Sequence, residues 1–291
     1  MTTKVVTIKE TGVEYAMDVR LKKNLDTKVI PNLTKKDKDC VIVVDGKEGS
    51  GKSTLAMQMG VYVDHSFTLK RLVFSPEDFR SAIISAKKGQ CIIYDEAFTG
   101  FSSRNSLSPI NRVLVSLAMQ MRQKNLFVII VLPTIFLLDK YMAIFRTRAL
   151  IHVYESSGRR GYFRIFNARK KQQLILKGQK TMSYNHKGLY TRFKGRFYGK
   201  FALGGPEVEK EYRKNKEKAL SDSEKTTMSS AQVRFKEQRD LLLFLLKTNT
   251  QMTYKNLSLL FEEYSFIISL EQISKICARF GVDRNKKTEN E

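Results

Sequence analysis

The chain has 291 residues, of which 42% are hydrophobic and 28% are charged, and this composition excludes an intrinsically disordered protein. Its formal net charge of +23 favours a polyanionic partner, either nucleic acid or an anionic membrane face, over a generally basic soluble protein. Three widely spaced cysteines without a CxxC pair argue against a disulfide framework or zinc site and predict a cytoplasmic protein. The most apolar stretch, residues 126–138, is too short to span a membrane.

Residues 1–39 form a polar lead-in, and residues 40–155 then alternate between strand and helix patterns. Continuous apolar runs predict buried strands at 41–46, 71–74, 91–94, 126–132 and 150–154. Helical patterns lie between them at 52–63, 76–87, 110–124 and 136–145. This alternation predicts an α/β fold with a mostly parallel, doubly wound sheet.

Residues 46–53, GKEGSGKS, match the phosphate-binding pattern GxxxxGK[ST] and stand between an apolar strand and a helix. Glycines let such a loop curl until its backbone N–H groups face the phosphates, and the helix N-terminus adds a partial positive charge. We expect Lys52 to reach the β- and γ-phosphates and Ser53 to ligate Mg²⁺. The predicted ATP-binding residues are Gly46, Lys47, Glu48, Gly49, Ser50, Gly51, Lys52, Ser53 and Thr54.

Two adjacent carboxylates end the next long apolar strand, in the segment CIIYDE at 91–96. Asp95 is placed to face the Mg²⁺ ion held by Ser53, and Glu96 to polarise a water for attack on the γ-phosphate. Thr134 follows the third long strand. It is either a catalytic sensor beside the γ-phosphate or part of a strand-ending Pro-Thr turn.

The segments DGKEGSGKST, IIYDEAF and MRQKNLFVIIVLPTIFLLDKYMAIFRTRALIHV resemble the additional-strand, catalytic-glutamate P-loop ATPases with a RecA-like core. Within that class, residues 40–154 resemble FtsK/HerA-type DNA-pumping ATPases and the zonular occludens toxin-like proteins of phages and mobile elements. The chain departs from many of these relatives at Pro133-Thr134, where a Thr-Gln pair is common.

The resemblance implies a homo-oligomer, with a hexameric ring as the candidate assembly, in which a neighbouring subunit's arginine completes each site. Arg146 and Arg148, just before the last core strand, are the candidate arginines, and Arg104 and Arg122 are further ones. Each of them is equally well explained as a solvated or phosphate-contacting side chain.

Residues 156–205 form a small basic segment that we expect to be rich in short antiparallel strands. Between 156 and 200 there are 13 Lys or Arg, eight aromatic residues and no Asp or Glu. The aromatic residues, such as Tyr162 and Phe197, either stack on bases or form a small core. The cations predicted to contact nucleic-acid phosphates are Arg159, Arg160, Arg164, Arg169, Lys170 and Lys171.

Residues 206–230 predict a charged helix followed by a linker, and residues 231–291 predict a separate helical domain with a tail. Three short helices, the last opened by a capping box at Ser269 and Gln272, resemble a helix-turn-helix. Lys275 and Arg279 on that helix would then contact DNA. A helical protein–protein docking module is the alternative.

These patterns together predict a Mg²⁺-dependent ATP hydrolase that acts on double- or single-stranded DNA. The leading expectation is an oligomeric translocase, packaging or DNA-loading motor of a virus, plasmid or mobile element. A nucleotide or small-molecule kinase is one alternative, because EGSGKST also resembles nucleoside monophosphate kinases. An ATP-switched protein that binds DNA and recruits it to a partner is another.

Overall fold

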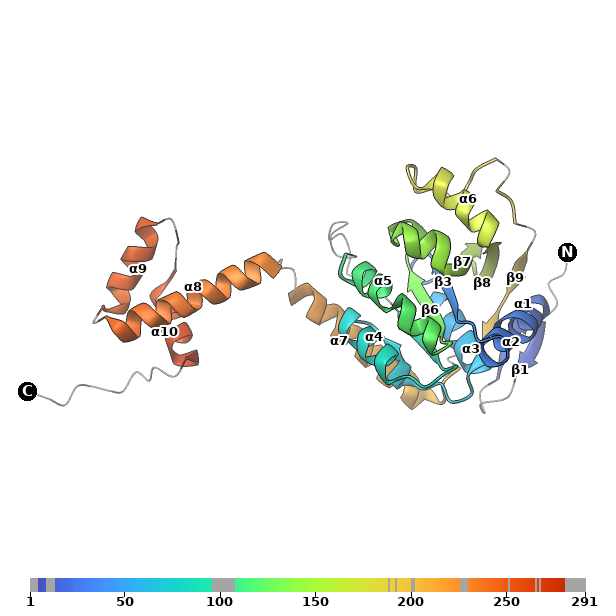
Figure 1. Cartoon of the computed structure of the whole chain (residues 1–291), viewed down its shortest axis with the longest axis horizontal. Coiled ribbons are helices and arrows are strands. Elements are labelled where there is room, and N and C mark those ends of the chain that lie inside the picture. Colours follow the sequence, from blue (N-terminus) through green and yellow to red (C-terminus); the bar gives the residue numbers. More distant parts are fainter. Residues whose placement is uncertain are drawn as a thin grey trace, which may run out of the picture. The chain divides into compact units, whose positions relative to one another are not determined.

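The computed structural model describes residues 5–8, 14–95, 108–187, 189–191, 193–199, 202–225, 230–250, 252–264, 266 and 268–280. The chain divides into two compact units, Met1–Ser223 and Glu224–Glu291. The first is an α/β unit and the second is helical (Figure 1).

A seven-stranded sheet forms the centre of the first unit. Its strands, in spatial order, are β4 (Leu72–Val73), β5 (Cys91–Asp95), β6 (Phe127–Leu132), β3 (Cys40–Gly46), β7 (Thr147–Ser156), β8 (Arg159–Asn167) and β9 (Lys194–Arg196). The five strands from β4 to β7 are parallel, while β8 and β9 continue the sheet antiparallel. The predicted α/β fold with a mostly parallel sheet is therefore confirmed, and β6 lies between β3 and β5.

Helices cover both faces of the sheet (Figure 1). One face carries α4 (Pro76–Ser85), α5 (Ser108–Gln123) and α6 (Ala168–Gly178). The other carries α1 (Val19–Asn24), the π-helix η1 (Leu25–Val29), α2 (Ile30–Thr34), α3 (Lys52–Val63) and a small sheet of β1 (Val5–Ile8), β2 (Tyr15–Asp18) and β10 (Tyr198–Gly199).

The side chains of β3 explain this two-sided packing. Val41 and Val43 join the core on the α4–α5 side, whereas Ile42 and Val44 join the core on the α3 side. Because successive side chains of a strand point to opposite faces, a continuous apolar run needs cover on both. The run VIVV therefore specifies a central strand.

Two predicted segment boundaries do not separate compact units. The lead-in supplies core residues, since Tyr15, Met17 and Leu21 are buried against α3 and the sheet. The basic segment after residue 155 belongs to the same sheet, because β8 pairs with β7 along most of its length. The first clear division lies instead between Ser223 and Glu224.

Local structure differs from expectation in two places. The helix predicted at 136–145 is replaced by a 3-10 turn, η3 (Ile135–Leu137), and a π-helix, η4 (Met142–Arg146). Asp139 accounts for the break, because its carboxylate accepts the N–H of Tyr141 at 2.9 Å and competes with helical pairing. Conversely, α6 forms within the segment predicted to be strands, with Asn167 capping its first turn.

Helix α7 (Pro206–Lys225) closes the first unit and confirms the predicted charged helix. The remaining short elements of the unit are the 3-10 turn η2 (Leu69–Arg71) and the loops that join the strands. No helix among the described residues is both long and apolar enough to cross a membrane.

The second unit consists of α8 (Ser230–Asn249), α9 (Tyr254–Glu263) and α10 (Leu270–Arg279). Its core brings together Leu243, Leu257, Phe261 and Ile273, all of which are buried. The predicted capping box is present, with Ser269 accepting the N–H of Gln272 and the Gln272 side chain accepting the N–H of Ser269. The three predicted helices are thus confirmed.

Candidate functional site

The glycine-rich loop, residues 46–51, lies at the carboxyl edge of the sheet between β3 and α3. Gly46, Gly49 and Gly51 all have positive φ angles, of 142°, 73° and 99°. A Cβ atom on Gly46 would lie 2.1 Å from the carbonyl oxygen of Val153, so that position has both the space and the backbone conformation of glycine alone. The glycines of the motif are therefore required by the curl of the loop.

The first turn of α3 opens toward this loop without a side-chain cap. Gly51 stands at the N-cap position in a left-handed conformation and gives no capping hydrogen bond. Unpaired N–H groups at a helix N-terminus attract anions, and phosphate is the anion that best suits several converging donors. The N-terminus of α3 therefore has no side-chain group of its own to satisfy its first N–H donors.

Lys52 is folded back over the loop. Its ammonium donates to the carbonyl oxygens of Gly46 and Lys47, each at 2.8 Å. Burial lowers the pKa of Lys52 from its ordinary value, while the nearby carboxylate of Asp95 acts against that shift. The lysine is thus held at the centre of the site, within reach of an anion bound to the loop.

Asp95 ends β5 at the same edge and is almost completely buried, with 1% of its surface exposed. Its Oδ2 accepts the hydroxyl of Tyr212 at 2.7 Å and lies 3.3 Å from the ammonium of Lys216. The hydroxyl of Tyr212 is also hydrogen bonded to the side chain of Ser53. The two residues predicted to ligate Mg²⁺, Ser53 and Asp95, therefore meet at one phenol oxygen.

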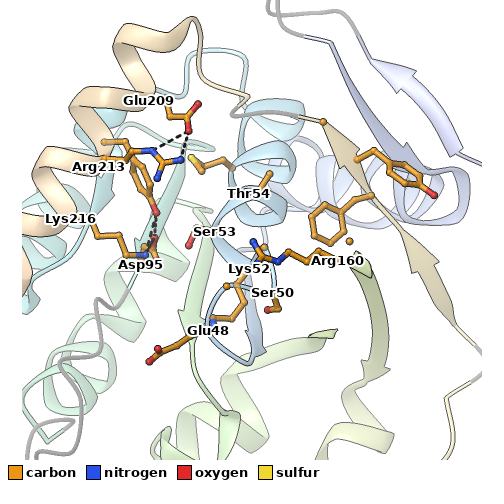
Figure 2. A pocket seen from close by; sticks show the side chains of 18 of the residues that line it. Glu48, Ser50, Lys52, Ser53, Thr54, Asp95, Arg160, Glu209, Arg213 and Lys216 are labelled. Atoms are coloured by element: carbon orange, nitrogen blue, oxygen red, sulfur yellow. Dashed lines mark hydrogen bonds and ion pairs between the residues drawn. The ribbon is translucent and has the colours of Figure 1, made fainter. Parts of the chain in front are cut away.

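A cavity of about 870 Å³ surrounds these groups (Figure 2). Besides the loop and Asp95, it is lined by residues of α7 and of the β8 and β10 region that the sequence did not predict as parts of a nucleotide site. Those from α7 are Glu209, Tyr212, Arg213, Lys216 and Glu217. The sequence signal for these residues was the spacing of Tyr212 and Lys216 by four positions, which puts both on one face of the predicted charged helix.

Arg160 also lines this cavity. In Figure 2 it reaches from β8 toward the loop that carries Ser50 and Lys52. Its Nε donates to Glu155 at 3.1 Å, and its Nη2 lies 3.7 Å from where a Cβ of Gly49 would be. Arg160 was predicted to contact nucleic acid, but the structure places it beside the glycine-rich loop.

Thr134 is engaged in a buried network next to the loop. Its hydroxyl lies 2.7 Å from that of Tyr184, which in turn donates to Oδ2 of Asp45. Asp45 is fully buried and also accepts the N–H of Ile135 and, at 2.8 Å, pairs with Nδ1 of His152. Burial and the charge of Asp45 raise the pKa of Tyr184 far above its ordinary value, so the phenol stays protonated. The network fixes Thr134 at the end of β6.

The arginines proposed to act from a neighbouring subunit lie at the opposite, amino edge of the sheet. Arg146 donates to Asp39 at 2.5 Å and to the carbonyl oxygen of Ala118, and Arg148 donates to the backbone of Asp39. Arg122 lies at the end of α5 and pairs with Asn125. Within one subunit these side chains cannot reach the cavity, so any role for them would be in a neighbour's site. Arg104 lies outside the described residues.

The predicted nucleic-acid contacts on the basic segment fall into different environments. Arg159 and Arg169 are exposed, and Lys170 is half-buried. The guanidinium of Arg164 lies over the rings of Tyr154, Phe166 and Tyr184. These residues do not form one continuous phosphate-binding row.

The prediction that Lys171 contacts nucleic acid is wrong. Lys171 is completely buried, and its ammonium donates to the carbonyl oxygens of Ala143, Ile144 and Thr147 and to the Thr147 hydroxyl. A side chain in that position joins α6 to the end of η4 and cannot contact a nucleic-acid phosphate. The aromatic residues Phe163, Phe166 and Phe197 are likewise buried, which confirms their alternative interpretation as core.

On α10, Lys275 is exposed and forms a solvent-exposed ion pair, at 2.6 Å, with Glu271 one turn earlier on the same helix. Arg279 instead donates to the buried carboxylate of Asp240 at 3.0 Å and so ties α10 to α8. Lys275 is therefore the better placed of the two for an intermolecular contact.

The residues at the carboxyl edge fit a Mg²⁺ ion that is bound jointly with phosphates. No cluster of three or more His, Cys, Asp or Glu able to hold a metal occurs within the described part of the chain. Mg²⁺ commonly takes only one or two protein oxygens and completes its shell with phosphates and water. The hydroxyl of Ser53 and the carboxylate of Asp95 are hard oxygen ligands of that kind. Glu96 lies outside the described residues.

Comparison with models of known protein families and with curated proteins finds no match for this chain. The chemistry of the cavity and the order of the strands therefore carry the functional inference.

Proposed function

We propose that this chain is a Mg²⁺-dependent ATPase that acts on DNA as an oligomeric translocase, packaging or DNA-loading motor. The observation that carries the proposal is the convergence of three groups at one cavity: the open N-terminus of α3, the ammonium of Lys52, and the Ser53–Asp95 oxygen pair. Backbone donors, a cation and a pair of hard oxygens are what a metal-bound triphosphate requires.

The strand order supports the class of reaction. β6 lies between β3, which leads into the glycine-rich loop, and β5, which ends at Asp95. An additional strand at this place is what the resemblance to catalytic-glutamate ATPases implies. It brings Pro133 to the wall of the cavity and Thr134 into the network that borders the loop. Hydrolysis rather than transfer to a second substrate is therefore the favoured outcome.

Each residue has a task in the proposed reaction. The backbone donors of the loop and the ammonium of Lys52 bind the phosphates and offset their charge as the terminal bond breaks. Ser53 and Asp95 would hold Mg²⁺, which when bound neutralises the β- and γ-phosphate oxygens. Glu96, next in sequence to Asp95, is the proposed residue that orients the attacking water.

DNA is the proposed partner because of the charge and the second unit. The net charge of +23 is far larger than a nucleotide site needs, and polyanions gain affinity from each neutralised phosphate. The second unit has the three-helix form that helix-turn-helix domains share, with the exposed Lys275 on its last helix. We propose in addition that Arg146 or Arg148 completes the site of a neighbouring subunit in a ring.

Steady-state ATP hydrolysis with and without double- and single-stranded DNA tests this function. We expect DNA to stimulate turnover, and Lys52→Ala and Glu96→Gln to lower it about 100-fold or more. Lys87→Ala, an exposed lysine at the opposite edge of the sheet, is the control and should leave turnover unchanged. If DNA does not change ATP turnover but a phosphate-accepting nucleotide raises it, the chain is a kinase and not a DNA motor.

A further inference from the structure

Helix α7 crosses the cavity and makes contact with the proposed metal ligands. Tyr212 and Lys216 lie one turn apart on it, and both face Oδ2 of Asp95, at 2.7 and 3.3 Å. The ammonium of Lys216 is also 3.3 Å from the hydroxyl of Tyr212. Figure 2 shows the side chain of Lys216 reaching from α7 to the neighbouring carboxylate of Asp95. The three groups form a compact triangle.

This triangle provides Asp95 with what a buried carboxylate needs. Only 2% of its side chain is exposed, and an unpaired charge at such burial would be strongly destabilising. Lys216 supplies the opposite charge and Tyr212 supplies a hydrogen bond.

The same arrangement competes with a divalent cation. The hydroxyl of Tyr212 donates to Asp95 and lies beside Ser53, so it competes with Mg²⁺ for the two oxygens that would ligate the ion. Lys216 would in addition repel a second positive charge placed at Asp95, because the site is buried and poorly screened. One cation or the other can hold Asp95, but not both in this geometry.

The attachment of α7 makes such an exchange feasible. Of its side chains between 206 and 219, none is fully buried, and the half-buried ones follow a single stripe: Val208, Glu209, Tyr212, Lys216 and Ala219. Tyr212 packs on the ring of Phe74, with centroids 5.8 Å apart. A helix that buries one narrow stripe opens at lower cost than a core element does.

We propose that Tyr212 and Lys216 are positioning residues that hold Asp95 in place of the metal ion and thereby set how much Mg²⁺ the site requires. Mg²⁺ bound together with nucleotide is coordinated by Asp95 only after the ammonium of Lys216 moves away from that carboxylate and the middle turn of α7 shifts away from the cavity. The inference rests on the proposed function, because it takes Asp95 and Ser53 as the metal ligands.

The test is a Mg²⁺ titration of the binding of a fluorescent, non-hydrolysable ATP analogue to the full chain. For Lys216→Met we expect the half-saturating Mg²⁺ concentration to fall about tenfold, the equivalent of about 1.4 kcal/mol. Lys216→Arg should restore the wild-type value, and Tyr212→Phe should lower it by a smaller factor. Lys214→Met, an exposed lysine on the same helix, is the matched control and should leave it unchanged.

Hydrogen exchange on the wild-type chain gives a second readout that needs no variant. The backbone amides of residues 209–219 should exchange faster with Mg²⁺ and the analogue together than with the analogue in EDTA. Equal or slower exchange would overturn the proposal. So would a Lys216→Met chain that binds the analogue more weakly with and without Mg²⁺, because Lys216 would then be a direct nucleotide ligand. If the wild type and Lys52→Ala bind the analogue equally poorly, the proposed function itself fails.

Discussion

Arg160 shows how the position of one side chain changes its interpretation. By composition it belongs to the basic segment, and a basic segment predicts nucleic-acid phosphates as ligands. In the structure Arg160 instead lines the cavity beside Gly49, and its Nε donates to Glu155. The phosphate nearest to Arg160 would then belong to the nucleotide.

Arg160→Ala should therefore weaken the binding of the ATP analogue about tenfold, since a charge-assisted hydrogen bond at an exposed site contributes about 1.4 kcal/mol. Fluorescence titration at constant Mg²⁺ measures the change. Arg159→Ala is the control, because Arg159 is the exposed neighbour and does not line the cavity. If Arg160→Ala leaves the nucleotide affinity unchanged but weakens DNA binding, Arg160 contacts nucleic-acid phosphates, as the sequence predicted.

At the scale of the elements, the parts of the site that the sequence predicted are those that are local in the chain. The glycine-rich loop and Asp95 follow directly from apolar strands, and the parallel sheet brings those strand ends to one edge. Lys216 approaches Asp95 across 121 positions of sequence, a contact that no local pattern encodes. The π-helix η4 was missed for a similar reason, because its end is completed by Lys171 of α6.

Lys171 therefore joins two elements, and its removal should be costly. Lys171→Met would leave the buried carbonyl oxygens of Ala143 and Thr147 without this donor, so we expect the free energy of unfolding to fall by about 3 kcal/mol. Denaturant unfolding of the full chain at pH 7 measures the loss. Lys177→Met, on an exposed position of the same helix, should change it by less than about 0.5 kcal/mol.

The loss of stability in Lys171→Met should depend on pH in a defined way. Burial lowers the pKa of Lys171 from 10.5 to about 8. Between these two values the unfolded chain holds a proton on Lys171 that the folded chain has released, so the free energy of unfolding rises with pH across this window. The difference between wild type and Lys171→Met should therefore widen from pH 8 to 10.5. If the free energies of unfolding of wild type and Lys171→Met change in parallel with pH, Lys171 does not titrate as a buried group.

At the scale of the whole molecule, the cavity does not explain the net charge of the chain. The cavity combines cations such as Lys52 and Arg160 with acids such as Glu48 and Glu209, so it does not account for a net charge of +23. The excess lies almost entirely in the first unit, because Glu224–Glu291 carries 11 Lys or Arg against 9 Asp or Glu. A large cationic excess favours binding through counterion release, which is steep in salt and weakly dependent on sequence.

The contribution of the second unit to that binding can be tested at Lys275. Its ion pair with Glu271 is exposed on both sides and contributes little to stability, so Lys275→Ala should fold as the wild type does. Arg279 is less suitable, because its removal would leave Asp240 buried without that partner. If Lys275 contacts a DNA phosphate, the slope of log affinity against log salt should become shallower by about one for every DNA sequence tested.

Fluorescence anisotropy between about 50 and 200 mM salt measures that slope. Lys87→Ala removes the same charge from an exposed loop of the first unit and should leave the slope unchanged, because a contact counts only where a counterion is displaced. If Lys275→Ala and Lys87→Ala lower the salt slope by the same small amount, net charge alone attracts DNA. No loss at Lys275 would instead favour a protein-docking role for the three helices, since exposed apolar side chains such as Leu241, Leu242 and Leu245 already line α8.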